Sequence, residues 1–127
     1  NWLCKPFMIT PVPLIDLTPH TNAVLIQDSI PANLDISLID DMPQITDRDA
    51  FAMCRKLSTQ EGLLCGGSTG VNVHAAVELA KTLEVPSGEE ATIVCIAPDS
   101  GVKYLSKIYN DRWLKEKGLL VEDPIEE

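Results

Sequence analysis

Leu63-Leu64-Cys65-Gly66-Gly67-Ser68-Thr69-Gly70 is the stretch that decides the fold class of this chain. A short apolar run such as Leu63-Leu64-Cys65 fits either a strand or a helix when it stands alone. The glycine pair that follows favours a strand that ends in a tight turn. A segment with helical spacing begins directly after the turn, from about Ser68 to Leu83. Because glycine accepts positive φ and lets other groups approach the backbone closely, this strand-to-helix turn is a candidate ligand site.

A helix is predicted before the turn, from about Asp47 to Glu61. Thr46-Asp47-Arg48-Asp49 has the form of a capping box at its start, with Asp as a weaker partner than Glu. Gly62 is expected to end it in the left-handed conformation. Its buried stripe recurs at helical spacing and consists of Ala50, Met53, Cys54 and Leu57.

After the turn, the predicted helix has an inner stripe made of Ala76, Leu79, Ala80 and Leu83. Ala91 to Ala97 is the clearest predicted strand and is apolar enough to be buried on both faces. Strand, helix and strand then form a βαβ unit with parallel strands and a right-handed crossover. A broken helical stretch follows from about Val102 to Lys117, with Gly118 as its stop.

The first part of the chain has a weaker pattern. Residues 1–22 contain four prolines and are predicted to be an irregular lead-in. Val24 to Ile26 is a candidate short strand, and Ile36 to Ile45 allows one or two more. We therefore divide the chain into a lead-in (1–22), a domain portion (23–120) and an acidic tail (121–127). The predicted fold class is α/β with a mostly parallel sheet.

Composition excludes several classes of function. The net charge is −9, from 19 acidic and 10 basic residues, so the chain repels nucleic-acid phosphates and no nucleic-acid partner is expected. No apolar run is long enough for a transmembrane helix, and the opening does not resemble a signal peptide. The four cysteines show no metal-ligand spacing, so no metal site is expected, and they fit a reduced cytoplasmic protein.

The chemistry of the turn leaves three alternatives open. It lacks the spacing of the dinucleotide fingerprint GxGxxG, and no lysine follows it as a phosphate-binding P-loop requires. A tight structural turn with a serine cap, an anion site at the helix N-terminus and a site for another ligand all fit these residues. Open α/β sheets bind ligands at the carboxyl ends of their strands, which favours a functional reading.

Two ordered motifs add a resemblance to a known family. Glu61 to Gly70 and Ile96 to Lys107 resemble, in the same order, segments of the cystathionine β-synthase/cysteine synthase family of fold-type II pyridoxal-phosphate enzymes. A third segment, Asn110-Asp111-Arg112-Trp113-Leu114-Lys115-Glu116-Lys117-Gly118, is similar to the end of the catalytic core of its cystathionine-forming members. Ile30 to Asp35 also matches, so the resemblance covers roughly Ile30 to Leu120.

The resemblance implies a cofactor site. Ser68 stands where the family places the serine hydroxyl that hydrogen-bonds the pyridine nitrogen of pyridoxal phosphate. Gly66 and Gly67 would lie beside the ring, and Pro98 and Asp99 would close its edge. The implied reaction is β-replacement that condenses L-serine with homocysteine to cystathionine. The cysteine synthase reaction, from O-acetylserine and sulfide, is the nearest alternative.

The resemblance also indicates what this chain does not contain. The family's Schiff-base lysine and its glycine-rich phosphate loop match no segment here, so no catalytic residue is assigned. The chain resembles, over residues 23–120, the C-terminal portion of a catalytic domain. The resemblance thus implies an incomplete part of a three-layer α/β fold with a mostly parallel sheet. The chain is expected to be inactive and poorly stable alone, or to be a non-catalytic truncated paralogue. The parent enzyme is expected to act on small amino-acid substrates as a homodimer or larger oligomer.

Overall fold

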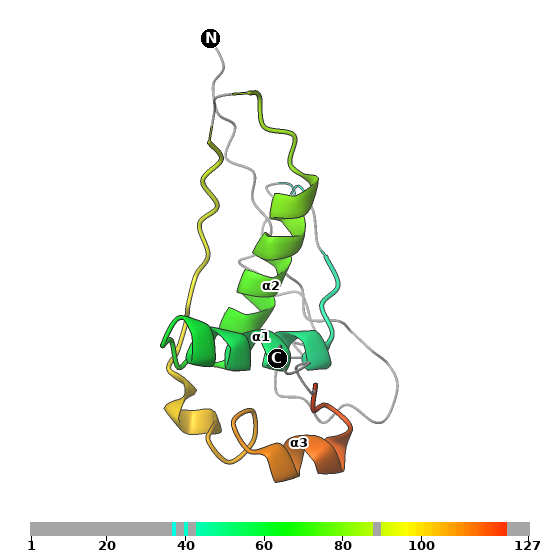
Figure 1. Ribbon diagram of the computed structural model, residues 1–127, viewed down its shortest axis with the longest axis vertical. Coiled ribbons are helices and arrows are strands. Elements are labelled where there is room, and N and C mark those ends of the chain that lie inside the picture. The colour runs from blue at the N-terminus through cyan, green and yellow to red at the C-terminus, as the bar shows by residue number, and fades with distance from the viewer. Residues whose placement is uncertain (1–36, 38–39, 41–42, 88–89, 122–127) are drawn as a thin grey trace, which may run out of the picture.

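The computed structural model describes residues 37, 40, 43–87 and 90–121. Its helical elements are α1 (Asp47–Gln60), α2 (Gly67–Thr82), the short 3-10 helix η2 (Gly101–Tyr104) and α3 (Asp111–Lys117). α1 crosses the N-terminal end of α2, and α3 lies on the side of α1 away from α2 (Figure 1). The ion pair between Arg55 on α1 and Asp111 on α3, at 2.7 Å, links these two helices.

Helix α1 confirms the sequence prediction closely. The Thr46 hydroxyl accepts a hydrogen bond from the backbone N–H of Asp49 at 3.2 Å, as a capping residue does. Gly62 follows the helix with φ of 69°, the left-handed conformation that only glycine adopts easily. In the predicted stripe, Ala50 and Cys54 are fully buried. Phe51 joins them, which the stripe did not include.

Helix α2 begins at Gly67, one position before the predicted start, but the predicted inner stripe is wrong. Ala80 and Leu83 are exposed, whereas Val71 and Ala75 near the start of the helix are buried. The cause is the crossing geometry, because α1 covers only the first turns of α2. In the second half of the helix, Ala76 and Leu79 are only half-buried.

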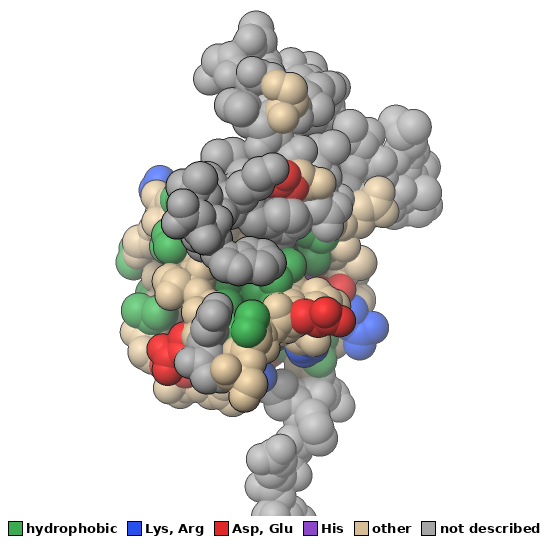
Figure 2. Space-filling view, turned by 90° about the horizontal axis from the view of Figure 1, so that it is seen from above, with side chains coloured by type: hydrophobic (Ala, Val, Ile, Leu, Met, Phe, Trp, Pro, Cys, Tyr) green, Lys and Arg blue, Asp and Glu red, His purple; other side chains and the backbone are tan. Residues whose placement is uncertain are grey.

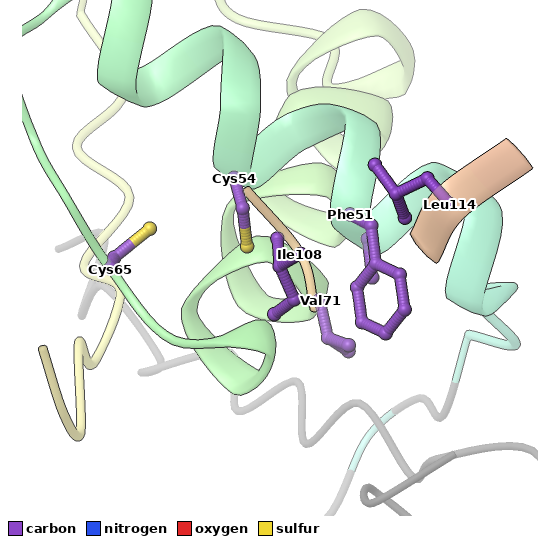
Figure 3. Packing of buried hydrophobic residues seen from close by; sticks show 7 residues of the cluster. Phe51, Cys54, Cys65, Val71, Ile108 and Leu114 are labelled. Atoms are coloured by element: carbon purple, nitrogen blue, oxygen red, sulfur yellow. The ribbon is translucent and has the colours of Figure 1, made fainter. Parts of the chain in front are cut away.

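The hydrophobic core lies where α1, α2 and the C-terminal segment meet. Figure 3 shows Phe51 and Cys54 directed from α1 into this cluster. The rings of Phe51 and Trp113 are tilted by 50° with their centroids 6.3 Å apart, a favourable aromatic geometry. The buried members are Ala50, Phe51, Cys54, Cys65, Val71, Ile108 and Leu114.

The predicted sheet is not formed by the described residues. Ala91 to Ala97 runs as an unpaired segment alongside α2 (Figure 1), tied by the Asn72 amide, which donates to the Ile96 carbonyl at 2.7 Å. The prediction that both faces are buried is wrong for this segment, since Val94 is 86% and Ile96 72% exposed. A strand needs a hydrogen-bonded neighbour, and no described residue supplies one. The parallel sheet therefore stays a prediction.

The C-terminal part is the broken helical stretch that the sequence predicts. η2 is followed by turns, and α3 begins where the Asn110 side chain accepts from the N–H of Trp113 at 3.1 Å. Gly118 ends α3 with φ of 68°, as predicted. Its N–H bonds the carbonyls of Leu114 and Lys115, so the helix end is satisfied by the backbone.

Some predicted segments cannot be compared with the structure, because they lie outside the described residues. The lead-in 1–22 and the strand from Val24 to Ile26 lie outside the described residues, as does the acidic tail beyond Val121. Within the described ranges, no helix has the length and apolar character needed to cross a membrane. Nor do the described His, Cys, Asp and Glu side chains gather into any group of three that could hold a metal ion.

Candidate cofactor-binding site

The glycine turn and the Pro98–Gly101 segment, far apart in sequence, are hydrogen-bonded to each other. The Gly66 N–H donates to the Asp99 carbonyl at 3.1 Å, and the Gly101 N–H donates to the Leu64 carbonyl at 3.1 Å. These two bonds flank an isolated antiparallel bridge between Cys65 and Ser100. The structure thus brings together Gly66 and Asp99, two of the predicted site residues.

Gly66 is required for close packing rather than for positive φ. Its φ is −80° and ψ is 167°, which any residue adopts, so of the two properties of glycine only the close approach applies at this position. A Cβ at this position would overlap Oδ1 of Asp99 and lie 2.9 Å from Cε2 of Tyr104. The missing side chain therefore makes room for the Asp99 carboxylate.

The Ser68 hydroxyl is not used to cap α2. The N-cap is Gly66, and α2 has no side-chain capping bond, because Ser68 is already the second helical residue. The serine-cap alternative is therefore wrong. Ser68 is half-buried, and its hydroxyl makes no capping bond to the helix. Thr69 beside it is buried, and its Oγ1 has no hydrogen-bond partner in this part of the chain.

The start of α2 is fixed through the carbonyl of Gly66. This oxygen accepts from the N–H of Thr69 at 3.0 Å and from the thiol of Cys54 at 3.3 Å. Burial, followed by the neighbouring Cys65, raises the pKa of the Cys54 thiol to about 12. Cys54 therefore stays protonated and can donate this bond at neutral pH.

Asp99 closes the other side of the turn. Its Oδ2 accepts from the Tyr104 hydroxyl at 2.9 Å, and Lys103 Nζ lies 4.0 Å away. The hydrogen bond to Asp99 raises the pKa of Tyr104. Asp99 Oδ1 is buried and has no partner within the described residues. Pro98, the other residue predicted at this edge, is exposed, and Gly67 is buried at the first position of α2.

Tyr109 belongs to this arrangement, although the sequence analysis did not single it out. Its hydroxyl donates to the Cys65 carbonyl at 2.6 Å and accepts from the Cys65 N–H at 3.1 Å. Tyr109 lies in an irregular segment without periodicity, so no pattern predicts its direction. The one sequence signal that could have singled out Tyr109 is a tyrosine next to the apolar residue Ile108. A tyrosine that is partly buried beside such a neighbour usually finds a hydrogen-bond partner for its hydroxyl.

Comparison with known proteins identifies relatives of this chain. Cystathionine beta-synthase of Oryctolagus cuniculus is 45% identical over 98 residues, which are 77% of this chain and 17% of the relative. Cysteine synthase 2 of Schizosaccharomyces pombe is 41% identical over 87 residues, 68% of this chain and 21% of that protein. The chain therefore spans about a fifth or less of the length of these curated relatives.

A solved structure of O-ureido-L-serine synthase superposes with a TM-score of 0.65 at 28% identity, covering 84% of this chain and 37% of that one. The family model described as "Pyridoxal-phosphate dependent enzyme" matches residues 9–99. This match begins inside the predicted lead-in and ends at Asp99, in the segment that binds the glycine turn. The match covers more than half of the chain, which therefore belongs to the family of pyridoxal-phosphate-dependent enzymes.

Proposed function

We propose that this chain forms the ring-nitrogen side of a pyridoxal-phosphate site in a β-replacement enzyme. The observation that carries the proposal is the Ser68 hydroxyl, which is half-buried at the N-terminus of α2 and makes no capping bond to that helix. A hydroxyl can donate to a pyridine nitrogen, and the side-chain-free Gly66 and Gly67 precede it. The donor set therefore fits one side of the cofactor.

Pyridoxal phosphate, when bound, supplies the electron sink for chemistry at the α-carbon of an amino acid. In the proposed role, the Ser68 hydroxyl donates to the ring nitrogen and leaves it unprotonated. A neutral donor makes the ring a weaker sink than a carboxylate would, which suits β-replacement and disfavours transamination. Gly66 and Gly67 would lie beside the ring, and the segment with Asp99 would close the edge of the site.

The covalent and phosphate-binding parts of the site are proposed to come from elsewhere in a longer protein. All lysines of the described part (Lys56, Lys81, Lys103, Lys107, Lys115 and Lys117) are exposed. A cofactor-bearing lysine is instead expected in a desolvated environment that lowers its pKa. The chain by itself is therefore expected to form no lysine adduct with pyridoxal phosphate that borohydride can trap. Such an adduct would contradict the proposed division of the site.

For the substrates, we propose L-serine and homocysteine, condensed to cystathionine by a cytoplasmic homodimer or larger oligomer with no nucleic-acid partner. The Asp-Arg-Trp segment at the start of α3 and the similarity to animal cystathionine beta-synthases support this choice. The similarity to a cysteine synthase supports the alternative pair, O-acetylserine and sulfide. Initial rates of the full-length protein with both pairs decide between them. A non-catalytic truncated paralogue is supported if the native transcript encodes no upstream lysine motif.

The role of Ser68 is tested in the full-length protein with Ser68→Asp and Ser68→Ala. Ser68→Asp introduces a carboxylate whose negative charge would favour the protonated form of the ring nitrogen, so β-replacement should fall steeply while the cofactor stays bound. Ser68→Ala should weaken cofactor binding. Thr69→Val is the matched control, because it removes the adjacent hydroxyl, which is buried and has no partner among the described residues. Unchanged turnover in Ser68→Asp contradicts the proposal.

A further inference from the structure

We infer that Tyr109 is a positioning residue for the cofactor site, because its hydroxyl holds both backbone polar groups of Cys65 and so fixes the turn that carries Ser68. This inference rests on the proposed function and extends it to a residue 41 positions further along the chain than Ser68. The argument follows the hydrogen bonds from Tyr109 to α2.

The backbone around Cys65 is hydrogen-bonded on both of its sides. On one side, the carbonyl of Leu64 and the N–H of Gly66 bond the segment from Asp99 to Gly101. The N–H and carbonyl of Cys65 point the opposite way, because neighbouring residues of an extended chain direct their polar groups to alternate sides. In a sheet these two groups would bond a neighbouring strand. Here the Tyr109 hydroxyl occupies that place, with bonds of 3.1 and 2.6 Å.

The phenol is suited to this double role. Burial raises the pKa of Tyr109, so its hydroxyl keeps its proton at neutral pH and can donate to the Cys65 carbonyl. Its oxygen lone pairs remain available to accept from the Cys65 N–H. A phenylalanine would fill the same volume and leave both backbone groups of a buried residue without their partner.

The sequence also makes room for the ring. A Cβ at Gly101 would lie 2.8 Å from Cε2 of Tyr109 and 2.8 Å from the Cys65 carbonyl oxygen. Both distances are shorter than real contacts of a Cβ, so a side chain at position 101 would push the Tyr109 ring and the Cys65 backbone apart. The absence of a side chain at Gly101 therefore allows the Tyr109 ring to pack against Cys65.

A shift of the Cys65 backbone would move Ser68, because Gly66 connects the two through its backbone hydrogen bonds. Gly66 is bonded to Asp99 on one side, and its carbonyl starts α2 by accepting from Thr69. Ser68 is the second residue of that helix, so the direction of its hydroxyl depends on where Cys65 and Gly66 lie. Loss of the two bonds to Tyr109 should therefore weaken cofactor binding without altering the lysine or the phosphate loop.

The test is Tyr109→Phe in the full-length protein, with the affinity of the cofactor-free form for pyridoxal phosphate as the main readout. The expected result is about tenfold weaker binding, as for the loss of buried hydrogen bonds. The KM for the amino-acid substrate should stay within about twofold, because no substrate contact is removed. Arg55→Met is the control. It removes the bonds of Arg55 to Ile108 and Asp111, destabilises the same segment and does not touch Cys65.

Tyr109→Phe with wild-type cofactor affinity overturns the inference, as does an equal loss of affinity in Arg55→Met. If Tyr109→Phe does not fold, Gly101→Ala decides instead, because it keeps the hydroxyl but displaces the ring. It should weaken cofactor binding, and unchanged binding overturns the inference. A wild-type protein that binds no pyridoxal phosphate refutes the proposed function instead, so the two failures are distinguishable.

Discussion

Gly70→Ala should destabilise this chain, although glycine-to-alanine replacement within a helix is usually stabilising. Alanine at an exposed helix interior gains about 1 kcal/mol over glycine. At Gly70, however, a Cβ would overlap the Ala50 carbonyl oxygen and lie 2.5 Å from the Cys54 sulfur. Because Gly70 is where α1 crosses α2, the added methyl would force the two helices apart.

The magnitude follows from these contacts. Overpacking of a close-packed site costs about 1–3 kcal/mol, and the upper end applies because one of the overlapping atoms is backbone and cannot rotate away. Subtraction of the helix gain leaves a net loss of about 2 kcal/mol, which lowers the folded-to-unfolded ratio by about 30-fold. Urea unfolding of the chain, followed by far-ultraviolet circular dichroism, measures this loss directly.

A double-mutant cycle separates the two overlaps. Cys54→Ala removes the sulfur, so Gly70→Ala should cost about 1 kcal/mol less in that background than in the wild type. Gly62→Ala measures a different cost, the strain of alanine at a φ of 69°, because no atom lies within 4 Å of an added Cβ there. A Gly70→Ala variant as stable as the wild type, or more stable, would refute the crossing geometry.

Two further predictions concern the C-terminal part of the described structure. Asn110→Ala should lower the free energy of unfolding by about 1 kcal/mol, because the cap of α3 is lost; thermal melts check this, and Asn110→Ser should recover most of the loss. Stability should also fall as the pH rises above the ordinary tyrosine pKa of 10.0, since the folded state keeps the raised-pKa phenol of Tyr109 protonated while the unfolded chain ionises. This contribution is complete below pH 10, so melts at increasing alkaline pH should show a shallower decline in Tyr109→Phe.

The helices could be predicted from the sequence because their start and stop signals are local. Thr46 caps α1 through its own hydroxyl, and Gly62 and Gly118 adopt the left-handed conformation that the pattern requires. Such signals act within one turn of helix and do not depend on the rest of the protein. They therefore place α1 and the C-terminal end of α3 correctly.

The sheet and the inner stripe of α2 could not be predicted in the same way. Apolar residues in Ala91 to Ala97 indicate burial, but burial depends on partners that the described residues do not supply. The same holds for Leu83, which is apolar at helical spacing and exposed. Hydrophobic periodicity indicates which face of a helix or strand is apolar enough to be buried. Whether another element packs on that face depends on the whole fold.

The candidate site was predictable in part. Family resemblance singled out Gly66 and Asp99, and the structure joins them through the 3.1 Å bond between the Gly66 N–H and the Asp99 carbonyl. The assignment of Ser68 to the cofactor remains a prediction. Tyr109 was missed because its role depends on a contact with Cys65, 44 positions earlier in the chain, which no local pattern encodes.

The unpaired segment from Ala91 to Ala97 has a consequence for handling the protein. Its N–H and carbonyl groups lack strand partners among the described residues, and the apolar side chains of Val94 and Ile96 are open to solvent. Apolar side chains also lie open on the face in Figure 2. A bare apolar edge of this kind is a template for intermolecular β-pairing. The chain expressed alone should therefore aggregate with rising concentration, and a charge introduced by Val94→Lys should suppress that aggregation.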